Sequence, residues 1–154
     1  MDPYEALIHE LGELINVPIK LNERGNFVLT IDASIDLFIE REPNPDIFRI
    51  AAPLQTLAPG AVRLGVLQEA LKYNGQEPPR PGTFGYASRT SKLILFEQMR
   101  VSETNADSFS DWLETFITSA KTWHEALEAG LMAPGNFNPK ERPQPRGFFG
   151  LDKS

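Results

Sequence analysis

The chain has no cysteine, only two histidines and no long apolar run. The lack of cysteine excludes disulfides, thiol catalysis, iron–sulfur clusters and thiolate zinc sites. Apolar runs such as residues 93–96 are far shorter than the roughly 20 residues of a membrane-spanning helix. The first residues also lack the basic and apolar regions of a signal peptide. We therefore expect a soluble cytoplasmic protein with no membrane partner.

Positive charge is scarce, with 15 Lys and Arg against 21 Asp and Glu, a formal net charge of −6 over 154 residues. This balance argues against binding nucleic acid by neutralising phosphates. An acidic surface would suit a partner segment rich in Lys and Arg, and it also serves solubility alone. The length favours one domain, and a hydrophobic content of 41% argues against global disorder.

Proline, glycine and positive charge are concentrated at the C-terminal end. From residue 130 onward the chain has four prolines, four glycines and a net charge of +2, so the part before it carries −8. This composition without periodicity predicts a folded domain at residues 1–130 and a flexible Pro/Gly-rich tail at 131–154. Within the tail, Gly147-Phe148-Phe149-Gly150 fits either a small docking motif or two aromatics in a disordered end.

The spacing of apolar residues predicts eight secondary-structure elements, because three- and four-residue spacing indicates helices and alternation indicates strands. Asp2 with Pro3 can cap the first helix, and Asn105 or Asp107 can cap the last. The expected class is α+β, in the order α-β-β-β-α-β-β-α, with helices packed on an antiparallel sheet. The expected elements are helices at about 2–16, 62–73 and 107–129 and strands at 26–31, 35–41, 47–54, 83–87 and 92–100.

Catalytic and metal-binding patterns are incomplete. The pattern His-Glu-x-x-Glu occurs at residues 9–13 and 124–128, but a zinc protease needs a second His at the last position. Asp32 and Asp36 flank a turn, where carboxylates serve turn geometry more often than acid–base chemistry or cation binding. No serine lies in a nucleophile elbow, and residues 82–85 lack the end of a phosphate-binding loop. We expect no enzymatic activity, no metal and no cofactor.

Apolar residues exceed what one sheet covered by helices on one face can bury. The expected helix at 62–73 is apolar nearly all round. The strand at 92–100 has bulky side chains on both faces, such as Leu95 on one and Phe96 on the other. The surplus predicts a covering partner, either a second copy or a client protein.

Two stretches carry a family resemblance. Residues 70–74 (ALKYN) precede a Gly-containing loop and the strands at 84–87 (FGYA) and 92–97 (KLILFE), and the last helix has Phe116, Ala120, Trp123 and Leu127 at family-like spacing. In these features residues 2–129 resemble class I chaperones of type III secretion, the family of the Tir chaperone and the SycE- and SicP-like proteins. The Pro-rich stretch at 78–81 departs from the family pattern.

The resemblance implies a two-fold homodimer without ATP hydrolysis. Such a virulence-associated chaperone binds the N-terminal region of one or more secreted effectors and keeps it soluble and export-competent. The secretion-system ATPase is a further candidate partner. The alternative is a regulatory or sensory protein of the same fold, of the YbjN-like kind, without export cargo.

The resemblance also assigns residues to two surfaces, although it does not say which face of each early strand points outward. The effector-binding residues expected from it are Ile19, Leu21, Phe27, Leu29, Leu37 and Ile39. The dimer-interface residues expected from it are Val62, Leu64, Val66, Leu67, Leu71, Leu93 and Leu95.

Overall fold

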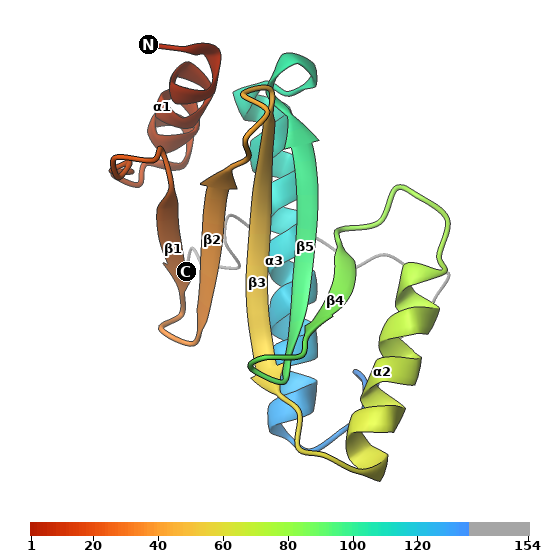
Figure 1. Cartoon of the computed structure of the whole chain (residues 1–154). Helices are drawn as coiled ribbons and strands as arrows, with labels where there is room; N and C mark the ends of the chain where they lie inside the picture. Colours follow the sequence, from red (N-terminus) through yellow and green to blue (C-terminus); the bar gives the residue numbers. More distant parts are fainter. Residues whose placement is uncertain (136–154) are drawn as a thin grey trace.

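The computed structural model describes residues 1–135 as three α-helices and a five-stranded antiparallel sheet (Figure 1). The predicted class and element order are confirmed. The elements are α1 (Pro3–Ile15), β1 (Phe27–Ile31), β2 (Ile35–Arg41), β3 (Ile47–Thr56), α2 (Ala61–Asn74), β4 (Thr83–Ala87), β5 (Lys92–Arg100), the 3-10 turn η1 (Val101–Glu103) and α3 (Ala106–Glu128).

The strand order across the sheet is β1-β2-β3-β5-β4, so β1 and β4 form its two edges. In Figure 1, α3 lies behind the central strands, α1 lies at the β1 end and α2 lies beyond β4 at the opposite end. β3 is two residues longer than predicted, and its pairing with β5 shifts register between Pro53 and Gln55. Because proline has no N–H to donate, such a bulge is a usual place for it in a strand.

The core fills the space between the sheet and its helices. Phe48 of β3 makes edge contacts with Tyr4 of α1 and Phe109 of α3, at ring-centre distances of 5.6 and 5.4 Å. A second aromatic group joins α2 to the other end of the sheet, where Phe84 lies 4.9 Å from Tyr73 and 4.6 Å from Trp123. The two groups fix α1 and α2 at opposite ends of one continuous core.

The predicted helix caps are confirmed. The Asp2 side chain accepts a hydrogen bond from the Glu5 N–H, with Pro3 in the first turn of α1. Asn105 and Ser108 cap each other reciprocally at the start of α3. Such caps satisfy backbone donors that a helix start leaves unpaired, so local sequence determines these boundaries. No helix within the described residues is long and apolar enough to cross a membrane.

The first residues of the expected tail contact the folded body. The Leu131 N–H donates to the Ala126 carbonyl at 2.9 Å, Ala133 packs against the core and Pro134 is buried. The rest of the expected tail, including the Gly147–Gly150 motif, lies outside the described residues.

Candidate binding surfaces

A groove lies where α1 ends and the chain turns toward β1. One hollow of about 460 Å³ lies at the end of α1, and a second of about 270 Å³ continues along β1. Val17 and Pro18 line both hollows, so the two adjoin at these residues and are together called the α1–β1 groove. Its other lining residues are Ile8, His9, Gly12, Glu13, Asn16, Ile19 and residues 28–32.

Local backbone geometry forms this groove. Asn16 takes a left-handed conformation (φ 56°) and ends α1, and the Val17 N–H then donates to the Gly12 carbonyl at 3.1 Å. A Cβ at Gly12 would lie 3.2 Å from the Val17 carbonyl oxygen and 3.5 Å from Ile19 Cδ1. Gly12 therefore lets residues 17–19 return closely along the helix.

Polar contacts fix α1 beside the early strands. The Tyr4 hydroxyl donates to the Gly25 carbonyl at 2.8 Å, and the Arg41 guanidinium lies 4.6 Å from the Tyr4 ring centre. Arg41 also pairs with Asp2 at 2.7 Å. The Glu5 N–H and Arg41 lower the pKa of Asp2, and burial raises the pKa of Tyr4. The helix side of the groove is therefore held at a fixed distance from the sheet.

The strand side of the groove is an edge of the sheet. Within residues 1–135, β1 pairs only with β2, and no backbone hydrogen bond joins residues 18–21 to β1. Val28 stands on this edge strand with 51% of its surface exposed. An edge strand offers unpaired N–H and C=O groups to an extended peptide. The groove thus combines a strand edge with apolar side chains.

Four of the six residues expected to bind effector point into the core. Ile19 and Leu21 are half-buried beside the groove. Phe27, Leu29, Leu37 and Ile39 are at most 8% exposed and belong to the core of this chain. They alternate inward because α1 and α3 cover that face of the sheet, so their side chains are not offered to a partner. The outward side chains of β1 and β2 include Val28 and Phe38 instead.

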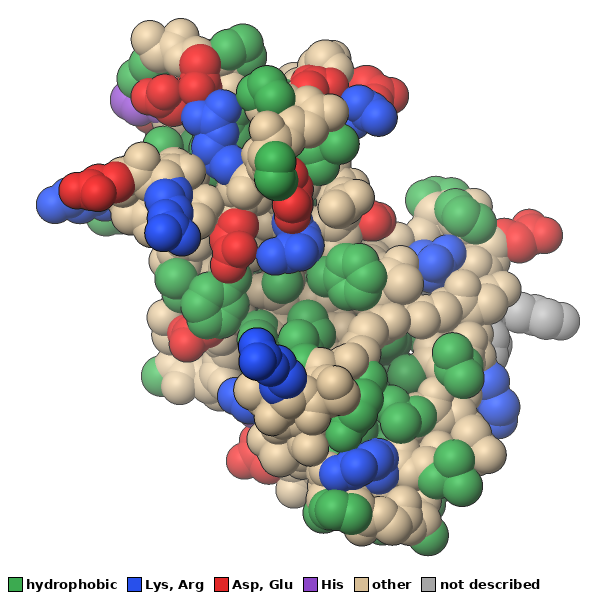
Figure 2. All heavy atoms as spheres, viewed as in Figure 1, with side chains coloured by type: hydrophobic (Ala, Val, Ile, Leu, Met, Phe, Trp, Pro, Cys, Tyr) green, Lys and Arg blue, Asp and Glu red, His purple; other side chains and the backbone are tan. Residues whose placement is uncertain are grey.

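An apolar row crosses the outward face of the sheet, which Figure 2 shows as hydrophobic patches over the central strands. The register places Val28, Phe38, Ala51 and Phe96 side by side across four strands, and Thr83 of β4 follows Phe96 at the end of the row. Phe38 and Phe96 are half-buried within the described chain. This face extends from the α1–β1 groove toward β4.

The expected dimer-interface residues divide into two sets. Val62, Leu64 and Leu71 are 54–69% exposed on α2, and Leu67 is half-buried. Val66, Leu93 and Leu95 are at most 1% exposed and pack inside the protomer, so they cannot contact a second copy directly. Sequence could not separate the sets because α2 has apolar residues on several sides.

Charge distinguishes α2 from the other helices. α1 contains three Glu and neither Lys nor Arg, and α3 contains five acidic residues and one Lys. α2 contains Arg63, Glu69 and Lys72, with Glu69 and Lys72 paired at 3.1 Å. Of the three helices, α2 alone has no net negative charge.

The residues considered for chemistry have structural partners. Each histidine pairs with a Glu on its own helix, His9 with Glu13 at 3.0 Å and His124 with Glu128 at 3.2 Å. Asp32, in the β1–β2 turn, pairs with Lys121 of α3, and the Asp36 carboxylate accepts a hydrogen bond from the Thr30 hydroxyl. Within residues 1–135 no group of three or more His, Asp or Glu is placed to hold a metal ion.

The family model described as "Tir chaperone protein (CesT) family" matches residues 6–124. The chain belongs to the CesT family. The match includes the α1–β1 groove, the whole sheet and α2, and it stops before residues 131–134. A search of curated protein sequences found no match to this chain.

Solved structures share the fold of this CesT-family chain. A chain of the Yersinia pestis type III secretion chaperone SycH in complex with a YscM2 fragment has a TM-score of 0.64 and 18% identity, covering 77% of this chain and 98% of that one. A chain of the ExoT–SpcS complex of Pseudomonas aeruginosa has a TM-score of 0.61 and 16% identity, and the match covers 79% of this chain and 97% of that one. A chain of the ExsC–ExsE complex has a TM-score of 0.60 and 19% identity, and the match covers 79% of this chain and 91% of that one. At these identities the likeness shows the fold alone.

Proposed function

We propose that this chain is a type III secretion chaperone that binds the N-terminal region of one or more effector proteins and keeps that region soluble and export-competent. It acts in the cytoplasm as a homodimer and needs no catalytic group, metal or cofactor. The secretion-system ATPase is a candidate partner for the loaded complex. Family membership and the chaperone complexes among its structural neighbours support this role.

The observation that carries the proposal is the α1–β1 groove beside the unpaired edge of β1. An extended effector segment would add backbone hydrogen bonds to β1 and place apolar side chains near Val17, Pro18 and Val28. Glu13 lines the same groove, and α1 carries no Lys or Arg. Basic residues of the effector segment would therefore be favoured there.

The exposed apolar side chains of α2 support the homodimer. Leu64 and Leu71, seven residues apart, share one side of α2, and Val62 lies on the opposite side; all three are exposed on the helix most distant from the groove (Figure 1). Two copies of an acidic chain can meet through α2 without repulsion between excess carboxylates on this helix, because it has none. Contact through α2 would leave both α1–β1 grooves open to effector.

A groove variant with a matched control tests effector binding. Val28→Lys puts a charge into the groove, and Leu14→Lys puts the same charge on α1 at a side chain of nearly equal exposure (49%) that does not line the groove. Both tagged proteins are isolated from the native cells, and bound protein is identified by mass spectrometry. We expect wild type and Leu14→Lys to retain a secreted effector. The amount of effector recovered with Val28→Lys should be at least tenfold lower. Equal recovery with Val28→Lys would contradict the groove assignment.

A further inference from the structure

Residues 131–134 return from the end of α3 to the surface of α2. The Leu131 N–H donates to the Ala126 carbonyl, and Ala133 and Pro134 pack against the body. The family model ends at residue 124, so this segment is not part of the matched region. The family match therefore assigns this segment neither a position nor a role.

One contact joins this segment to the middle of α2. The Met132 side chain lies over Gly65, and a Cβ built at Gly65 would collide with Met132 Sδ and lie 2.7 Å from its Cε. Glycine inside a helix lowers helix propensity by about 1 kcal/mol relative to alanine. At this position the missing side chain provides the space that Met132 occupies.

The contact extends the apolar face of α2. Gly65 lies between the side of α2 that carries Leu64 and Leu71 and the side that carries Val62, so Met132 covers the part of the helix surface between these exposed residues. Leu131 and Met132 remain 49% and 43% exposed. With Val62, Leu64 and Leu71 they make up five of the eight large hydrophobic residues that are exposed within residues 1–135. We call these five residues the α2 patch.

We propose that Leu131 and Met132 belong to the surface that a second copy of this chain covers, so that the segment after α3 completes the α2 dimer interface. This inference rests on the homodimer of the proposed function. A second copy is the favoured occupant because Met132 lies on α2, which is the one helix of residues 1–135 without net negative charge. An exposed apolar surface concentrated in one place is typical of a protein–protein interface.

Sedimentation analysis over a concentration series tests the proposal on the full-length chain. Leu131→Asp and Met132→Asp are compared with Leu14→Asp, whose side chain is as exposed as Leu131 but lies on α1. We expect each of the first two changes to raise the dimer dissociation constant at least tenfold, and Leu14→Asp to change it less than twofold. Circular dichroism should be the same for all three.

The outcomes separate this inference from the proposed function. A wild-type chain that is monomeric at micromolar concentration contradicts the homodimer itself. A dimeric wild type with unchanged dimerisation of Leu131→Asp and Met132→Asp overturns only the inference. Variants that stay dimeric but lose bound effector would assign the α2 patch to cargo and also overturn it.

The Gly65–Met132 contact gives an independent test that does not introduce charge. Gly65→Ala displaces the Met132 side chain, whereas Met132→Ala removes the collision. We expect each single change to weaken the dimer, and the double variant to be no weaker than Met132→Ala alone. If the fold-changes in the dimer dissociation constant of the two single variants multiply in the double variant, the two residues act independently, which would contradict a coupled role at the interface.

Discussion

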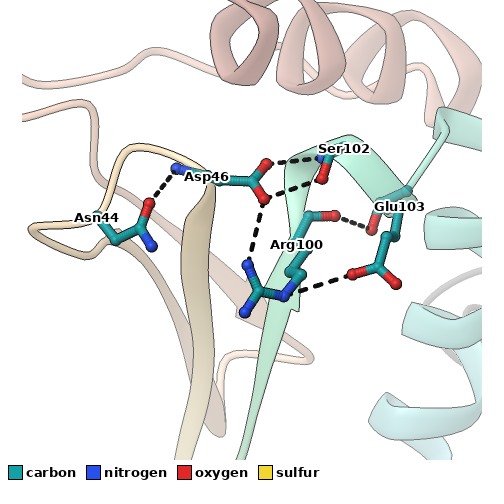
Figure 3. Close-up of polar contacts among 6 residues, drawn as sticks. Asn44, Asp46, Arg100, Ser102 and Glu103 are labelled. Carbon is teal, nitrogen blue, oxygen red and sulfur yellow. Dashed lines mark hydrogen bonds and ion pairs between the residues drawn. The ribbon is translucent and has the colours of Figure 1, made fainter.

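Asp46 accepts two hydrogen bonds from Ser102, one from its backbone N–H and one from its hydroxyl, each at 2.9 Å (Figure 3). Arg100 adds an ion pair to the same carboxylate at 3.4 Å. The Ser102 donors, followed by Arg100, lower the pKa of Asp46 below its ordinary value of 3.8. This carboxylate therefore joins the β2–β3 turn to η1, the turn that leads into α3.

Stability should depend on the charge of Asp46. Because its native pKa is lowered, its contribution is present above pH 3.8 and is lost as the pH falls through the lower native value. We expect Asp46→Asn to lower the unfolding temperature near neutral pH, with the difference from wild type closing as the pH falls below 3.8. Thermal unfolding at several pH values measures this, with Glu23→Gln, an exposed loop residue, as the control. A difference independent of pH would contradict a role for the charge.

The Tyr73 hydroxyl should stabilise the α2 end of the core. It donates to the Pro81 carbonyl at 2.7 Å and lies 3.4 Å from Ser119 Oγ. Tyr73→Phe leaves a buried carbonyl without this donor, so we expect the free energy of unfolding to fall by about 1–2 kcal/mol in urea titrations at pH 7.

Tyr73 also predicts a response to alkaline pH. Burial is the main cause that raises the pKa of Tyr73 to about 12 from its ordinary value of 10.0. The native state therefore disfavours the phenolate, and wild type should lose stability as the pH rises from about 10 to about 12. The Tyr73→Phe variant should lack this part of the loss. Identical alkaline unfolding of the two proteins would contradict the account.

Substitutions at the residues expected in the dimer interface should have different effects, depending on whether the side chain is exposed or buried within the protomer. Leu64→Asp changes a side chain that is 59% exposed, so we expect dimer loss with unchanged circular dichroism. Leu95→Asp buries a charge in the core of the protomer and should unfold it. Sedimentation together with thermal unfolding distinguishes the two, and a dimeric Leu64→Asp protein would contradict the α2 interface.

Truncations should locate the end of the folded body. The sequence predicts a boundary at residue 130, whereas Ala133 and Pro134 pack against the body. We expect a chain ending at Gly135 to unfold at the wild-type temperature and one ending at Gly130 to unfold about 2–4 °C lower, since roughly 1 kcal/mol of packing is removed. Equal unfolding temperatures would support the boundary at 130.

Local signals in the sequence were sufficient to predict the elements. Asp2 with Pro3 marks the start of α1, and Asn105 marks the start of α3, because capping depends on residues within one helical turn. Alternation and turn residues likewise located every strand, although the Pro53–Gln55 register shift was missed. These features depend little on the rest of the fold.

Which face of each helix or strand points into the core could be determined only from the structure. In β1 both Phe27 and Val28 are apolar, and only packing by the helices decides that Phe27 points inward. The bulk of Phe27, Leu29 and Ile31 against Val28 and Thr30 was the available signal for that choice. The Gly65–Met132 contact joins residues far apart in sequence, so no local pattern indicates it.

The central claim, effector binding, is tested most directly by isolating the native complex and mapping its bound segment by limited proteolysis and mass spectrometry. We predict a secreted protein that is protected over its N-terminal region and bound to a dimer of this chain. Recovery of the dimer without any secreted protein would contradict the chaperone role and favour the regulatory alternative.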